Sequence, residues 1–148
     1  MKKENVREID LGYIPIANWE STDGLTPSWA REKGEPELDH NEKVLQGSKD
    51  YKLEIDYPLS RPCILDSRTP SVGVSRINFV EAVVQAYRDI YDAEDETSKV
   101  KAGNIPGMFN RNTTDGKYGI WGHDIGDLML HTAYVDEETG IITLGVDS

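Results

Sequence analysis

The sequence predicts an α+β fold in which one amphipathic helix packs on a mainly antiparallel sheet that ends in a C-terminal β-hairpin. Apolar residues recur at helical spacing over residues 78–95, and two strand-like segments, 127–135 and 141–146, flank a turn that contains Gly140. The chain has 148 residues, of which 37% are hydrophobic, and this is the usual size of one domain with its own core. We therefore expect a single domain over residues 1–148.

The helix has the most regular pattern in the sequence. Asn78 is expected to cap its N-terminus, because Glu81 follows three residues later, as in a capping box. The apolar side chains that follow lie three and four residues apart and define one buried face. They are Phe79, Val80, Val83, Val84, Ala86, Tyr87, Ile90 and Tyr91. The acidic residues within 92–96 oppose the helix dipole, so we expect the helix to end near residue 95 with these carboxylates in solvent.

Shorter apolar segments predict the remaining strands. Residues 51–57 alternate apolar and charged side chains, which is typical of a half-buried strand. Residues 9–19 suggest an irregular strand at a sheet edge, because Pro15 cannot donate a backbone hydrogen bond there. Residues 63–65 predict a short buried strand, and residues 72–74 predict another. The core is therefore expected within residues 51–148.

Residues 1–50 are expected to form an irregular arm or lid beyond the edge strand. Residues 20–50 are polar, rich in glycine and proline, and lack periodicity. Three interpretations remain open: an arm pinned by Trp19 and Trp29, a mobile lid, or partial disorder. In the strand at 127–135, apolar side chains occur at both odd and even positions and therefore point to both faces of the sheet. The sheet is then either buried on both sides or covered by the helix on one face and by this arm on the other.

The net charge of −11 comes from 27 acidic and 16 basic residues. It is spread evenly, with −4 over residues 1–50, −3 over 51–100 and −4 over 101–148. Such a field repels phosphate backbones, so we expect no nucleic-acid partner. No apolar run spans a bilayer and no signal peptide is evident, which favours a cytoplasmic protein without a membrane partner. Cys63 is the single cysteine and cannot form an internal disulfide.

One short segment combines imidazole and carboxylate groups. His123, Asp124 and Asp127 lie within five positions among glycines, and these groups can perform acid–base chemistry or bind a metal. A metal needs three or four ligands, and the other histidines, His40 and His131, are far away in the sequence, so no metal site is predicted. The alternative is structural, in which the aspartates cap a turn. A small metal-dependent or acid–base hydrolase is therefore the second hypothesis.

Three arginines define another candidate site. Arg61, Arg68 and Arg76 lie among serines and threonines before the helix, where guanidinium groups can bind a phosphate or carboxylate. The alternative is that each arginine pairs with a neighbouring carboxylate. Tyr118 and Trp121, on the glycine-rich segment, complete the predicted ligand-binding set.

The leading hypothesis is a non-catalytic binding or interaction domain. The loops 20–50 and 101–126 contain most of the polar and aromatic residues that the core does not explain, and loops on a rigid core commonly form recognition surfaces. The expected partner is a protein or an anionic small molecule, and no cofactor is expected. An oligomeric structural module is a third alternative.

Overall fold

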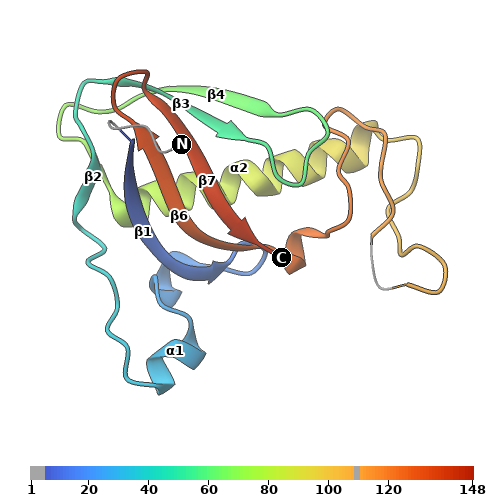
Figure 1. Ribbon diagram of the computed structural model, residues 1–148, viewed down its shortest axis with the longest axis horizontal. Coiled ribbons are helices and arrows are strands. Elements are labelled where there is room, and N and C mark those ends of the chain that lie inside the picture. The colour runs from blue at the N-terminus through green and yellow to red at the C-terminus, as the bar shows by residue number, and fades with distance from the viewer. Residues whose placement is uncertain (1–5, 109–110) are drawn as a thin grey trace.

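The computed structural model describes residues 6–108 and 111–148. For Ser28 and Arg31, within the first range, it describes the backbone alone. A five-stranded sheet is packed on one face by a single long helix (Figure 1). The strands are β1 (Val6–Pro15), β2 (Lys43–Leu45), β3 (Asp50–Ile55), β4 (Cys63–Arg68), β5 (Val74–Ser75), β6 (Met129–Asp136) and β7 (Ile141–Asp147). The helices are α1 (Ser28–Glu32) and α2 (Arg76–Thr97), with 3-10 turns η1 (Ser21–Asp23) and η2 (Ile125–Asp127). The α+β fold class is confirmed.

The strand order of the main sheet is β1-β6-β7-β3-β4. All neighbours are antiparallel except β3 and β7, which run parallel. The predicted C-terminal hairpin is formed by β6 and β7, and Gly140 closes its turn with a φ of 75°. The predicted edge strand is β1, which pairs with β6 alone in this sheet. Strands β2 and β5 form a separate two-stranded sheet.

Helix α2 covers the sheet with the predicted apolar face. Val80, Val83, Val84 and Tyr87 are at most 3% exposed. They belong to one core cluster with inward residues of β3, β6 and β7, including Leu53, Val135 and Ile142. Burial of each such side chain contributes roughly 1.5–3 kcal/mol to stability. This contact determines where the loops at both ends of α2 lie.

The predicted N-cap of the helix is wrong, and the helix ends two residues beyond the predicted range of about 78–95. Ser75 is the N-cap, and its hydroxyl accepts a hydrogen bond from the Asn78 backbone at 3.3 Å, so Asn78 already lies in the first turn. The helix continues to Thr97 instead of ending near residue 95. Glu94, expected in solvent, is instead fully buried against the following loop.

Strand β4 also differs from the prediction. Residues 63–65 were expected to be buried, yet Ile64 is 60% and Leu65 39% exposed. The reason is topological, since β4 pairs only with β3 and forms the second edge of the sheet. The arm does not cover the other face of the sheet, because it extends beyond the end of β1 (Figure 1). Among the described residues, no helix is long and apolar enough to cross a membrane.

Candidate functional site

The segment between β1 and β2, residues 16–42, forms a structured arm. Its first residues are bound by Arg88, a partly buried residue in the middle of α2. Nη2 of Arg88 donates to the carbonyl oxygens of Ile16, Ala17 and Trp19 at 3.5, 3.2 and 2.7 Å. Hydrogen bonds from a charged donor are stronger than neutral ones, so this side chain determines the path of the chain as it leaves the sheet.

The last residues of the arm are bound by a second arginine of α2. Arg76 donates from Nη1 to the Asp39 carbonyl at 2.8 Å and from Nε to the Asp10 carbonyl at 2.9 Å. Nη1 also lies 3.3 Å from a carboxylate oxygen of Glu42. Arg76 is 7% exposed. Its Nε and Nη1 groups are therefore engaged by the chain itself, although the sequence suggested Arg76 as a ligand-binding residue.

Between these ends, the arm packs closely on β1. Trp19 is 3% exposed, and its indole Nε1 donates to the Gly24 carbonyl at 2.6 Å. Leu25 is fully buried. A Cβ at Gly12, where φ is 84°, would lie 1.5 Å from the Leu25 carbonyl oxygen. Only glycine permits this close approach, and a bulge in β1 between Asp10 and Ile14 accommodates it.

Trp29 differs from Trp19 in being half exposed, although it also contacts β1. It lies on α1 and is 49% exposed. Its ring system and that of Tyr13 form a T-shaped contact, with centroids 6.2 Å apart and an angle of 77° between the planes. The ammonium of Lys33 lies 5.6 Å from the centroid of the Trp29 ring. The indole is thus oriented by neighbours while much of its surface remains in solvent.

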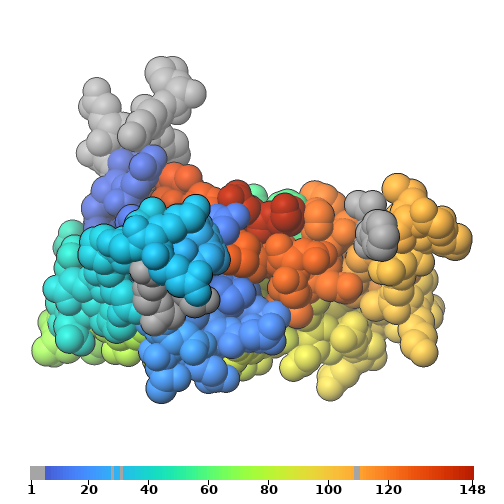
Figure 2. Space-filling view, turned by 90° about the horizontal axis from the view of Figure 1, so that it is seen from below, coloured from blue at the N-terminus to red at the C-terminus, as the bar shows by residue number. Residues whose placement is uncertain are grey.

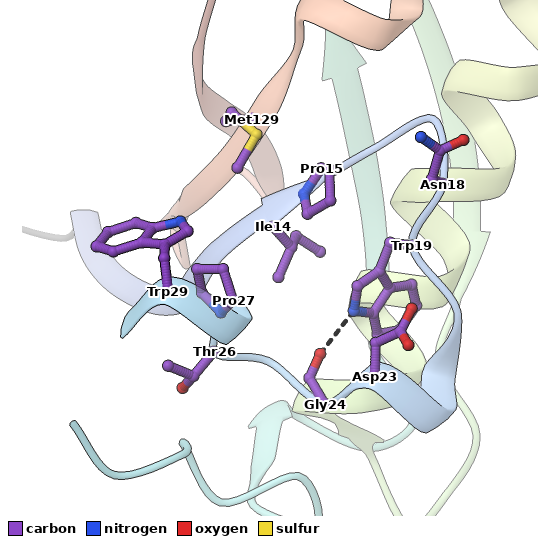
Figure 3. A pocket seen from close by; sticks show the side chains of 10 residues that line it. All are labelled: Ile14, Pro15, Asn18, Trp19, Asp23, Gly24, Thr26, Pro27, Trp29 and Met129. Atoms are coloured by element: carbon purple, nitrogen blue, oxygen red, sulfur yellow. Dashed lines mark hydrogen bonds between the residues drawn. The ribbon is translucent and has the colours of Figure 1, made fainter. Parts of the chain in front are cut away.

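A pocket of about 390 Å³ opens beside Trp29 (Figure 3). Trp29 and Trp19 lie on opposite sides of it, and Asp23 lies next to Trp19. The apolar part of its lining is formed by Ile14, Pro15, Pro27 and Met129, and the polar part includes Asn18 and Thr26. A second pocket of about 210 Å³ shares Thr26, Pro27 and Trp29 with the first and extends toward Tyr13 and Glu35.

The second long irregular segment, described at residues 98–108 and 111–123, is called the distal loop below. Figure 2 shows the arm and the distal loop toward opposite ends of one face of the molecule. Glu94, on the last turn of α2, binds this loop and is 0% exposed. Its carboxylate accepts hydrogen bonds from Oγ1 of Thr114 and from the backbone N–H groups of Gly116, Tyr118, Gly119 and Ile120, at 2.5–3.3 Å.

The environment of Glu94 favours its ionised form. Burial alone would raise the pKa of the carboxyl group. The hydrogen bonds from Thr114, Tyr118, Gly116 and Gly119 outweigh burial and lower the pKa to about 2. A Cβ at Gly116 would lie 2.6 Å from Oε1 of Glu94, so the loop approaches the carboxylate as closely as glycine allows.

Arg111, a residue of the distal loop itself, makes a second set of contacts that hold this loop in place. It is 3% exposed, and its guanidinium lies 5.5 Å from the centroid of the Tyr91 ring. Its Nε lies 3.0 Å from Oδ1 of Asp124. The Tyr91 hydroxyl donates to the His123 carbonyl at 2.8 Å. Asp124, a candidate catalytic residue in the sequence, is therefore the ion-pair partner of a buried arginine.

His123 lies between a hydroxyl and a carboxylate. Its Nε2 is 3.2 Å from Oγ of Ser148, and its Nδ1 is 3.8 Å from Oδ2 of Asp127. Its ring also belongs to a partly exposed aromatic group with Tyr57 and Trp121, whose ring centroids lie 5.4–6.3 Å apart. Within residues 6–108 and 111–148, no group of three or more His, Cys, Asp or Glu residues has the arrangement of a metal site.

The predicted ligand-binding residues are only partly brought together. Arg61 donates from Nε to the Lys117 carbonyl at 3.0 Å and from Nη2 to the Gly116 carbonyl, and its backbone N–H donates to the Tyr118 carbonyl, so it lies beside Tyr118. Arg68 is at the far end of β4, 3.1 Å from Oδ1 of Asp50. With Arg76 bound to the arm, the three arginines serve three separate parts of the molecule.

Sequence reasoning did not identify Glu94 and Arg88 as the residues that bind the distal loop and the arm. Glu94 follows Tyr87, Ile90 and Tyr91 at the spacing of the buried face, and that spacing was a signal for its burial. Arg88 carried no such signal, because its partners are backbone carbonyls of a distant segment.

Comparisons with protein-family models, curated proteins and solved structures found no significant match to this chain.

Proposed function

We propose that this protein is a non-catalytic binding domain that recognises a protein partner through the arm. The observation that carries the proposal is Trp29, which is half exposed and borders two adjoining pockets. Tryptophan is enriched among the residues that dominate binding energy at protein interfaces, especially where it adjoins pockets that a partner can fill.

The attachment of the arm supports this proposal. Arg88 and Arg76 bind its two ends to α2, so the pockets belong to the folded domain and do not have to form on binding. A preorganised surface loses less conformational entropy on association. Trp29 lies in the middle of this fastened segment, where a partner can reach it.

The same contacts disfavour an anionic small molecule as the ligand. Arg61 and Arg76 donate to backbone carbonyls, and Arg68 is paired with Asp50. An anion would have to displace these partners at three separate places. A protein surface that covers the arm needs none of these changes.

The proposal is tested by selecting a random peptide display library against the protein. We expect enriched peptides to bind the wild type, and Trp29→Ala to weaken that binding by at least about tenfold, which is about 1.4 kcal/mol. Trp121→Ala is the matched control, because Trp121 is a 39% exposed tryptophan outside the arm. Failure to enrich any sequence, or equal binding to Trp29→Ala, would overturn the proposal.

A hydrolase is the second candidate, and the position of His123 between Ser148 and Asp127 favours it. In this function His123 would act as a general base toward the Ser148 hydroxyl. Hydrolysis of p-nitrophenyl acetate by the wild type and by His123→Ala is the test. His131→Ala is the control, because His131 also lies between a hydroxyl, on Thr132, and a carboxylate, on Asp147. Equal rates for the wild type and both variants would exclude this candidate.

A further inference from the structure

We propose that the pocket between Trp19 and Trp29 binds a lysine or arginine side chain from a basic segment of the partner. This inference rests on the proposed function and adds the chemical class of the partner. It follows from three features of the molecule: the lining of the pocket, the cation already placed on Trp29, and the charge of the arm.

The lining matches a side chain with a long aliphatic stem and a charged end. Ile14, Pro15, Pro27 and Met129 provide apolar contacts for methylene groups. Asp23 lies in the same pocket beside Trp19 and provides a carboxylate (Figure 3). Lysine and arginine bury their stems against apolar surface and keep the charged group at a polar one.

The Asp23 carboxylate is held in place before any partner binds. It accepts a hydrogen bond from the Glu20 backbone at 2.9 Å, and the Glu20 side chain in turn accepts one from the Asp23 backbone. This reciprocal capping orders the short turn η1. A partner cation would therefore meet a carboxylate that is already oriented, which reduces the entropy lost on binding.

Trp29 already accepts a cation within the chain. The Lys33 ammonium lies 5.6 Å from its ring centroid, within the usual range of a cation–π interaction. An exposed contact of this kind contributes only about 0.5–1 kcal/mol. Lys33 does not line the pocket, and the indole remains half exposed, so a partner's lysine or arginine in the pocket can add a second contact to the indole.

The charge of the arm favours a basic partner over other occupants. Residues 16–42 contain seven acidic and two basic residues, so 27 positions carry −5 of the total charge of −11. This local field attracts cations and accelerates their association at physiological ionic strength, where screening acts over about 8 Å. A second copy of this chain is disfavoured, because it carries the same negative charge.

The test uses four capped pentapeptides that differ at the central residue, which is lysine, arginine, norleucine or glutamate. Binding is followed by nuclear magnetic resonance of the three tryptophan indole N–H groups of the ¹⁵N-labelled protein, with the Trp29 signal assigned from Trp29→Phe. We expect saturable shifts of the Trp29 and Trp19 signals with lysine and arginine at millimolar concentrations. Binding of norleucine and glutamate should be at least about fivefold weaker.

Two variants test the groups in the pocket. Asp23→Asn keeps the hydrogen-bond acceptor and removes the charge, so it should weaken the lysine peptide at least about fivefold. Glu81→Gln, on the exposed side of α2, removes the same charge elsewhere and should change binding less than about twofold. Lys33→Gln removes the internal cation and should strengthen binding. Equal weakening by Asp23→Asn and Glu81→Gln would overturn the inference.

The failures of the two proposals are distinguishable. If norleucine binds as tightly as lysine, the inference is overturned while the proposed function stands, since the pocket still accepts a side chain. If no peptide shifts either indole signal up to about 10 mM, the inference is also overturned. The proposed function is then decided by the display selection and its Trp29→Ala comparison alone.

Discussion

The arm and the distal loop are both long and irregular, and α2 binds them with opposite chemistry. Two arginines of α2 donate to carbonyl oxygens at the ends of the arm. One glutamate of α2 accepts from N–H groups of the distal loop. Backbone polar groups that leave a sheet still need partners, and a neighbouring helix can supply either donors or acceptors. Segments with little regular secondary structure can therefore be held in place by side chains of a neighbouring helix.

The two regions differ in where their contacts are concentrated. The distal loop converges on the single carboxylate of Glu94, whereas the arm is bound at its ends by Arg88 and Arg76. Trp29, in the middle of the arm, is about half exposed to solvent. We therefore expect loss of one side chain to affect the distal loop strongly, and substitutions in the middle of the arm to affect binding more than stability.

Among the side chains of α2 that bind the two regions, Glu94 is expected to show the largest effect when it is replaced by alanine. The substitution leaves Thr114 and four backbone N–H groups without their acceptor. We expect the free energy of unfolding to fall by roughly 4 kcal/mol, measured by urea denaturation. Glu96→Ala, two residues later in an exposed position, is the control and should change it by less than about 0.5 kcal/mol. Similar small effects for both variants would contradict the role assigned to Glu94.

Acid should weaken the same contact. Because the folded-state pKa of Glu94 is about 2 and the reference value is 4.5, its stabilising contribution is present above pH 4.5 and is lost as the pH falls toward 2. The difference corresponds to about 3 kcal/mol. The gap in unfolding free energy between wild type and Glu94→Gln should therefore narrow between pH 6 and pH 2.5. A gap that is constant over this interval would refute the assignment.

A smaller loss is expected at the start of the arm. Arg88→Ala removes the hydrogen bonds to the carbonyls of residues 16, 17 and 19 and should lower the unfolding free energy by about 2 kcal/mol. Hydrogen exchange of the arm amides should accelerate more than that of the distal loop. Arg68→Ala removes an exposed ion pair and should cost less than about 0.5 kcal/mol. Equal acceleration in both loops would show that Arg88 acts on the whole fold.

A still smaller effect on stability than that of Arg88→Ala is expected for Trp29→Ala. Since about half of the side chain is already exposed, the unfolding free energy should change by about 1 kcal/mol or less. Trp19→Ala, at a buried position, should cost roughly 3–5 kcal/mol. Thermal denaturation of both variants measures the contrast. A comparable loss for Trp29→Ala would support the alternative in which both tryptophans pin the arm.

Sequence reasoning succeeded where a pattern is local. The apolar face of α2 and the hairpin around Gly140 were predicted because their periodicities involve residues a few positions apart. The candidate site was harder, since Arg61, Arg68 and Arg76 are close in sequence but lie on different elements. Asp124 and Asp127 are three residues apart, yet one pairs with Arg111 and the other lies nearer His123.

The sequence by itself determined the amphipathic helix, the terminal hairpin and the strongly acidic character of the chain, because each depends on residue type and short spacing. Only the tertiary structure decided that Arg76, Arg88 and Glu94 bind loops and that Trp29 faces solvent while Trp19 does not. The physical reason is that these outcomes depend on backbone groups brought close by the fold. A backbone carbonyl or N–H group is present at nearly every position, so residue identity does not reveal which one a charged side chain will meet.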